Sequence, residues 1–226
     1  METLEPIVSF TLGGFTIDVS QEMVIQWGII ALIALLSWWA TRNLSIRPSK
    51  KQTVVETIYT SLRSIITSNV GEKYMDILPF IGTIAVYIFT MNMVGLVGLI
   101  PPTKTFSVTV ALGLISFFVI QSYAIKQHGL GSYFKGYAQP VFVMLPINLL
   151  ERLMFPISLA LRLFGNILAA TFLVELVYEN LHKVAFIAQI GLPVPLHGYF
   201  DIFDGVIQVV IFVMLTMINI KIVSEH

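Results

Sequence analysis

The chain has 226 residues, of which 56% are hydrophobic and only 12% are charged. A soluble domain carries roughly twice that charged fraction, so this composition excludes an ordinary soluble enzyme. Thirteen Lys and Arg balance thirteen Asp and Glu, so the chain has no net positive charge that would attract nucleic acid. Without Cys, and with four scattered His, the sequence gives no reason to expect thiol chemistry, a metal site or a cofactor.

The apolar residues come in long runs, which predicts an all-α, polytopic membrane protein with a single membrane domain. We expect five membrane-spanning helices and one amphipathic helix on the inner surface. An acidic N-terminal segment, 1–22, precedes the first span at 23–40, which has Trp near both ends as interfacial anchors. Basic residues follow this span, so the positive-inside rule places the N-terminus outside.

The next three expected helices are separated by short segments that contain polar residues, Pro or Gly. Residues 53–69 carry apolar side chains at three- and four-residue spacing, which predicts the amphipathic helix. Span two is expected at 77–100, where two Pro end it, and span three at 106–125. A short inner loop is expected at 129–139, because this stretch is rich in Gly and Tyr.

An almost continuous apolar stretch at 140–177 predicts a fourth span nearly twice as long as an upright helix requires. Such a helix must tilt steeply or bend, and Pro146 and Pro156 are the expected bends because each removes a backbone hydrogen bond. The last span, also expected to be long and tilted, is placed at 202–223 with the C-terminus in the cytoplasm.

The basic residues support this orientation. Ten of the thirteen fall in inner segments and only Lys104 and Lys183 in outer ones, while Arg162 lies within the membrane. The acidic N-terminus and the lack of an organelle-targeting signal favour the plasma (inner) membrane of a bacterium, although a protein encoded in an organelle would also lack such a signal.

Arg162 is the first candidate functional residue. A charge at the middle of a span costs about 2.5 to 3.5 kcal/mol on insertion scales, so an intramembrane Arg is a functional candidate by default. Arg also stays protonated, which suits a fixed positive charge that a mobile proton must not pass. The alternative is a structural ion pair with Glu151 or Glu175, and both interpretations stay open.

Polar side chains of the fourth span form one stripe with Arg162. At about 100° per residue, four of them lie within about 40° of the arginine, and the stripe therefore faces protein or water: Asn148, Glu151, Ser158 and Asn166. Thr171 and Glu175 lie on the opposite face, toward the outer end. Inner-side and outer-side polar groups thus point in different directions on either side of the arginine.

The last span has a polar stripe of its own, formed by Asp201, Asp204, Gln208 and Asn219. Carboxylates and amides are expensive in hydrocarbon unless they are paired or hydrated, so these residues are expected to line an aqueous entrance from the outer side. The alternative for the two Asp is a simple cap at the outer end of the helix, where Asp is favoured in the first turn.

Four segments together resemble the ATP synthase a subunit, the membrane stator of the rotary F-type enzyme. The most specific is PISLALRLFGNILA, residues 156–169, which surrounds Arg162. It is supported by NMVGLVGLIP at 92–101, SVTVALGL at 107–114 and IQVVIFVMLT at 207–216. The resemblance covers most of the chain from residue 77 on.

This resemblance implies an ion-translocating subunit that is not an enzyme by itself. It would offer protons two half-channels that meet the carboxylates of a rotating c-subunit ring and drive ATP synthesis. Implied partners are the c ring, the b subunits of the peripheral stalk, the rest of the F-type ATP synthase and the lipid bilayer. Arg162 matches the family's essential arginine, which separates the half-channels, and Asn166 and Gln208 match polar residues near it.

Three positions depart from the family pattern. Thr171 stands where many members have Glu, so Glu175 on the same face is expected to take over relay duty. Asp201 stands where many bacterial members have His, and its pairing with position 171 in the family favours a relay role for it. On the inner side, Asn148 replaces a common Glu, and Glu151 lies one turn further on.

The sequence leaves two other classes of protein as alternatives. In a secondary transporter or ion channel, Arg162 would bind an anionic substrate, but the inverted repeat typical of transporters is not evident. In an intramembrane hydrolase, Ser158 would be the nucleophile, but no flanking Gly or intramembrane His supports it. The choice between proton and sodium coupling stays open, because the ion-binding carboxylate belongs to the ring.

Overall fold

The structure is a computed structural model that describes residues 8–12, 15–42, 44–136, 142–182, 195–196 and 198–225. Within these ranges the chain is helical apart from one β-hairpin. Five helices are long and apolar enough to cross a membrane. The all-α class and the five expected membrane helices are therefore confirmed.

The first elements along the chain are a β-hairpin and two helices, and the two helices form a V. Strands β1 (Val8–Leu12) and β2 (Phe15–Val19) pair antiparallel, with Val8 opposite Val19. The sequence did not predict this hairpin. Helix α1 (Gln21–Thr41) and helix α2 (Lys50–Asn69) follow. The Ser49 side chain caps α2 by accepting a hydrogen bond from the backbone N–H of Gln52, which satisfies one free donor of the first turn.

The second expected span is built from three pieces. A 3₁₀ helix, η1 (Glu72–Ile77), leads into α3 (Leu78–Met93), which tightens into the single 3₁₀ turn η2 (Val94–Val97). Gly98 then takes a left-handed φ of 78°, which ends the helix before Pro101. Another 3₁₀ turn, η3 (Pro102–Lys104), connects to the next helix.

Helix α4 (Phe106–Gly136) continues past the expected end of span three. Gly129 breaks its direction with a φ of 75° and a ψ of 157°, and helix resumes on the other side. The inner loop predicted at 129–139 is therefore wrong for residues 130–136, because one left-handed Gly is enough to redirect a helix without a loop. Residues 137–139 lie outside the described part of the chain.

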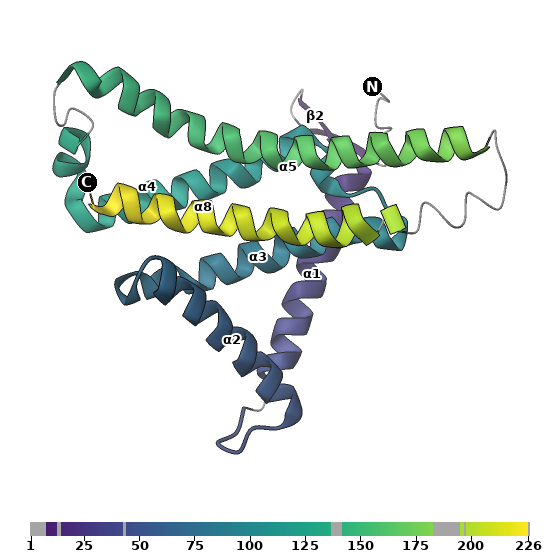
Figure 1. Cartoon of the computed structure of the whole chain (residues 1–226), viewed down its shortest axis with the longest axis horizontal. Helices are drawn as coiled ribbons and strands as arrows, with labels where there is room; N and C mark the ends of the chain where they lie inside the picture. Colours follow the sequence, from purple (N-terminus) through teal and green to yellow (C-terminus); the bar gives the residue numbers. More distant parts are fainter. Residues whose placement is uncertain are drawn as a thin grey trace.

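Helix α5 (Leu145–His182) follows a 3₁₀ turn, η4 (Phe142–Met144), and has 38 residues, or about 57 Å at 1.5 Å per residue. Figure 1 shows α5 as one helix that bends gently along its length. Pro156 lies inside it, as expected for a bend. Pro146 is the second residue, where no intrahelical hydrogen bond is lost, so the bend expected there is wrong.

The last span begins with a π-helix, η5 (Gly198–Asp204), that runs directly into α8 (Gly205–Glu225). The start expected for span four, residues 140–141, lies outside the described residues. Residues 183–194 and 197, between the last two spans, also lie outside the described residues, and Lys183 is among them.

Helices α3, α4, α5 and α8 run along one common direction, and α1 crosses that direction steeply (Figure 1). Helix α4 packs against both α5 and α8, and α3 packs against α8. Apolar side chains from these four helices form the core, among them Ile81, Ile88, Ile120, Leu159, Met217 and Ile220. In α1 only Glu22 and Ile29 are buried, so lipid or another subunit must cover this helix.

Candidate ion pathway

Packing against α4 fixes which face of α5 points outward. Gly113 of α4 lies so close to α5 that a Cβ there would stand 2.6 Å from the carbonyl oxygen of Pro156. Leu159 and Leu163 of α5 are buried, with only 1% of each exposed. Ser158 and Leu161 are exposed, and Arg162 at the border is half-buried.

The ion pair considered for Arg162 does not form within the described residues. Glu175 instead pairs with Lys104, whose Nζ lies 3.7 Å from the Glu175 Oε1. Glu151, the other candidate partner, is exposed. Among the residues that the structure describes, the Arg162 guanidinium makes no hydrogen bond or ion pair. Its charge is therefore available to a group outside this chain.

One turn beyond the arginine, a hydrogen bond joins the two long spans. The Asn166 Nδ2 on α5 donates to the Asp204 Oδ2 at the end of η5, and both residues are half-buried. Gln208, one turn further along α8, is buried, and its Oε1 has no hydrogen-bond partner among the described residues. The structure thus brings a carboxylate and two amides to the region where α5 and α8 meet.

Asp201 lies against the end of the second span. A Cβ added at Gly95 in η2 would stand 3.4 Å from both Asp201 carboxylate oxygens, an ordinary van der Waals distance, so this carboxylate lies directly against η2. Asp201 is in the first turn of η5, and the helix-cap interpretation therefore still applies to it. Asp204 is the last residue of η5 and bonds across to α5, so a cap alone does not describe it.

Asn92 anchors the junction between η5 and α8. Its side chain is buried, its Nδ2 donates to the Gly205 carbonyl at 3.3 Å, and its Oδ1 accepts from the Thr103 hydroxyl at 3.4 Å. Gly205 is buried against it, since a Cβ there would stand 3.2 Å from the Asn92 Cβ. The sequence singled out the segment 92–101 by resemblance alone; its contacts show that it positions Asp201 and Asp204.

The two outer-side residues of α5 behave differently. The Thr171 hydroxyl donates to the Ile167 carbonyl of its own helix at 2.8 Å. The Glu175 side chain is 62% exposed and faces Lys104 of η3. Lys104 is a candidate site residue that sequence reasoning missed. Its only signal was its position as one of two basic residues expected on the outer side.

The inner-side residues of α5 lie beside a second polar cluster. Tyr133 donates its hydroxyl hydrogen to the Gln121 Oε1 at 2.6 Å, and the Arg152 Nη1 donates to the same oxygen at 3.4 Å. Asn148 is half-buried, whereas Glu151 and Ser158 are exposed. Within the described residues, neither Glu151 nor Ser158 forms a hydrogen bond or ion pair with the cluster of Asn166 and Asp204.

Comparisons with known proteins agree on one family. A family model described as "ATP synthase A chain" matches residues 23–221. ATP synthase subunit a of Staphylococcus aureus is 35% identical over 244 residues, and that of Staphylococcus carnosus 34% identical over 241, with 100% of each chain covered. "ATP synthase subunit a, sodium ion specific" of Propionigenium modestum is 29% identical over 225 residues, covering 92% of this chain and 75% of that protein.

Proposed function

This chain belongs to the ATP synthase A chain family, and from that premise we propose that its two half-channels pass protons to and from the carboxylates of a rotating c-subunit ring. It is the ion-conducting stator subunit of the F0 sector, a multi-pass membrane protein that does not itself carry out ATP chemistry. The family expected from residues 156–169 is confirmed, so the transporter, channel and hydrolase alternatives are set aside.

The exposed face of α5 is the surface proposed for the ring. Exposed apolar side chains run along it on both sides of Arg162, including Met154 and Leu161 before it and Phe172 and Leu176 after it. A long apolar face with one uncompensated cation suits an apolar partner that carries a carboxylate within the membrane. The mostly exposed helix α1 is proposed to contact the b subunits of the peripheral stalk or lipid.

The observation that carries the proposal is the hydrogen bond from Asn166 to Asp204 beside Arg162. It places the Asp204 carboxylate against the turn of α5 that follows the arginine, and this carboxylate is proposed to serve the outer half-channel. Gln208 and Asp201 extend this polar region along α8 and η5, and Thr171 and Glu175 are proposed at its outer mouth. Asn148, Glu151 and Ser158 lie on the N-terminal half of α5 and are proposed to line the inner half-channel.

Arg162 separates these two sets of residues. An opposite charge within about 4 to 6 Å stabilises the ionised form of a carboxylate, so a ring carboxylate passing the arginine would release its proton. The guanidinium does not deprotonate and repels an excess proton, which prevents direct passage between the half-channels. Each proton that descends a potential of 100 mV releases about 2.3 kcal/mol, which biases the direction of ring rotation.

We assign the chain to the plasma (inner) membrane of a bacterium, with the N-terminus outside and the C-terminus in the cytoplasm. Sodium is the second candidate ion, because one relative is named sodium ion specific. A proton requires only groups that exchange it, and Asp204 with Asp201 and Glu175 supplies such groups on the outer side.

The test is ATP-driven pumping by inverted membrane vesicles that contain the whole complex, followed with a proton-sensitive and a sodium-sensitive dye. We expect the proton dye to respond, and Asp204→Asn to slow pumping about tenfold or more because the amide cannot exchange a proton. Glu179→Gln, an exposed acid near the end of α5 that the proposed pathway does not use, is the control and should pump normally. A response of the sodium dye alone would overturn the choice of ion, and equal rates for the two variants would overturn the outer pathway.

A further inference from the structure

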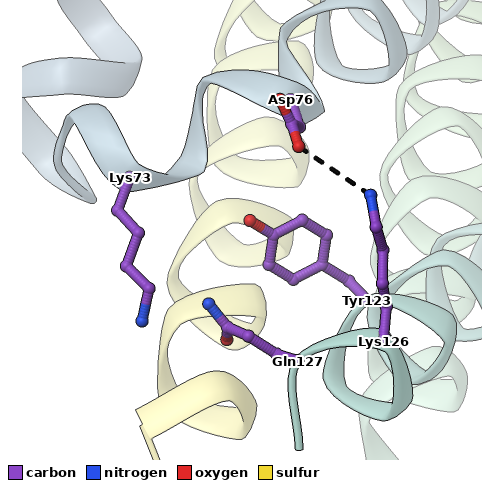
Figure 2. A pocket seen from close by; sticks show the side chains of 5 residues that line it. All are labelled: Lys73, Asp76, Tyr123, Lys126 and Gln127. Carbon is purple, nitrogen blue, oxygen red and sulfur yellow. Dashed lines mark ion pairs between the residues drawn. The ribbon is translucent and has the colours of Figure 1, made fainter.

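A polar pocket lies at the end of the bundle where α3 begins and where α4 and α8 end. Its volume is about 250 Å³. Figure 2 shows its lining side chains, which come from η1 and from the end of the first segment of α4: Lys73, Asp76, Tyr123, Lys126 and Gln127. The proposed ion pathway uses none of these residues.

The pocket carries more positive than negative charge. The Lys126 Nζ lies 3.9 Å from the Asp76 Oδ2, and about three quarters of each side chain is exposed, so this pair is loose and hydrated. Within the described residues Lys73 makes no ion pair. The pocket therefore has two ammonium groups and one carboxylate, and the Tyr123 ring lies between the two lysines (Figure 2).

Hydrogen bonds and a ring contact connect the elements that form the walls of the pocket. When the Gln127 amide is oriented so that its nitrogen donates to the Ser224 carbonyl at 3.2 Å, its oxygen accepts from the Lys73 Nζ at 3.0 Å. The His128 Nε2 lies 2.7 Å from the same Ser224 carbonyl, and the Tyr74 and Tyr123 rings are 5.8 Å apart. Contacts among η1, α4 and α8 thus hold the lysines around a preformed space.

The position of the pocket along the chain places it at a membrane surface. It follows α2, which is amphipathic and too polar to cross the bilayer, and it precedes the apolar α3. The charged residues of η1 and the end of α4 meet where these apolar helices give way to polar sequence. This is the depth at which phospholipid headgroups lie, and clustered Lys there attract anionic lipids.

We propose that this pocket binds the phosphate group of an anionic phospholipid headgroup, and that Lys73 and Lys126 hold the phosphate. A headgroup with free hydroxyls, such as that of phosphatidylglycerol, also offers donors to the Asp76 carboxylate. The bound lipid would join η1 to the end of α4, and so fix the amphipathic helix α2 to the bundle.

The test uses the whole complex in nanodiscs of phosphatidylcholine that contain a phosphatidylglycerol with a photoreactive headgroup. After illumination, labelled peptides of this chain are mapped. We expect label on peptides containing residues 72–77 and 123–128. Lys73→Gln with Lys126→Gln should reduce this label about 25-fold, since each surface Lys contributes about fivefold to anionic lipid binding. Arg47→Gln with Lys50→Gln removes the same charge outside the pocket and should leave the label unchanged.

Two controls keep the result interpretable. Lys73→Arg with Lys126→Arg keeps the charge and should retain the label, which separates lost binding from lost folding. Unlabelled phosphatidylglycerol should compete, and inorganic phosphate should not. Equal label in both Gln pairs would overturn the pocket. Competition by inorganic phosphate, or equal labelling by a photoreactive phosphatidylethanolamine, would overturn the anionic lipid.

Discussion

Three carboxylates lie near the C-terminal end of α5 and the start of the last span, and each has a different neighbour, which decides what the carboxylate can do. Asp204 accepts a hydrogen bond from Asn166, Asp201 lies against Gly95, and Glu175 faces Lys104. The pair of Glu175 and Lys104 is partly exposed, and such pairs contribute only about 0 to 1 kcal/mol to stability. Glu175 is therefore loosely held, as a group that exchanges protons with solvent must be.

A first prediction compares Glu175 with the acid one turn further along α5. If Glu175 relays protons in place of Thr171, then Glu175→Gln slows ATP-driven pumping severalfold, because the amide cannot exchange a proton. Glu179→Gln, an exposed acid on the same helix, is the matched control and should pump at the normal rate. Equal pumping rates for the two variants would remove Glu175 from the pathway.

At the scale of single residues, the sequence predicts which residues are candidates for the ion pathway better than it predicts their contacts. Arg162 could be singled out because a lone charge in an apolar run is costly, and Asn166 and Gln208 followed from the motif. The partner of Glu175 could not, because Lys104 lies on a connection far away in sequence. Likewise Asn166 and Asp204 were both named, but their hydrogen bond depends on how η5 packs against α5.

Two close contacts hold α5 and α8 in place. Gly113 of α4 contacts the backbone of α5 at Pro156, and Gly205 of α8 is enclosed by Asn92 and Met93 of α3. A side chain at Gly113 would push α5, which carries Arg162, away from α4. A side chain at Gly205 would push the start of α8, which follows Asp204, away from α3. The contact at Gly113 is the tighter one, at 2.6 Å against 3.2 Å at Gly205. It is also the harder one to relieve, because a backbone carbonyl cannot rotate away.

A second prediction concerns Gly113→Ala. Its Cβ would stand 2.6 Å from the Pro156 carbonyl oxygen, so α4 and α5 must separate, at a cost of about 1 to 3 kcal/mol. The measurement is the temperature at which this chain aggregates when the solubilised complex is heated, which should fall. Gly28→Ala has nothing within 4 Å of its Cβ and should not lower it. An unchanged temperature for Gly113→Ala would contradict this packing.

The sequence predicts helix boundaries well where polar or charged residues end an apolar run. The α1 range of 21–41 differs by only a few residues from the expected 23–40. The β-hairpin was missed because it lies in a short acidic segment expected to be only a tail. The sequence does not predict the helical turns at 130–136, because a stretch rich in Gly and Tyr favours a loop, whereas Gly129 alone supplies the break.

Among the described membrane-spanning helices, α1 crosses the direction that α3, α4, α5 and α8 share (Figure 1). Helix α1 has 21 residues, or about 32 Å, which matches the thickness of a bilayer core when upright. The 38 residues of α5 are far too long for that and must be steeply inclined. The length of the apolar run predicts that α5 tilts or bends, but not the direction or the angle, because these are set by packing between helices.

A third prediction tests the orientation, using the fact that the chain has no Cys. In inverted vesicles, a membrane-impermeant maleimide should label Ser68→Cys at the end of α2 but not Ser20→Cys ahead of α1. Vesicles of the opposite orientation should give the reverse pattern. Label on Ser20→Cys alone in inverted vesicles would place the N-terminus in the cytoplasm and contradict the proposed topology.

The most direct measurement is ATP-driven ion pumping by inverted vesicles containing the whole complex with Arg162→Ala. Arg63→Ala, an exposed arginine on α2, is the matched control. If Arg162 is the charge that separates two half-channels, its removal abolishes pumping while the complex still assembles, and the control pumps normally. Normal pumping by Arg162→Ala would contradict the account and leave the arginine without a role in ion transport.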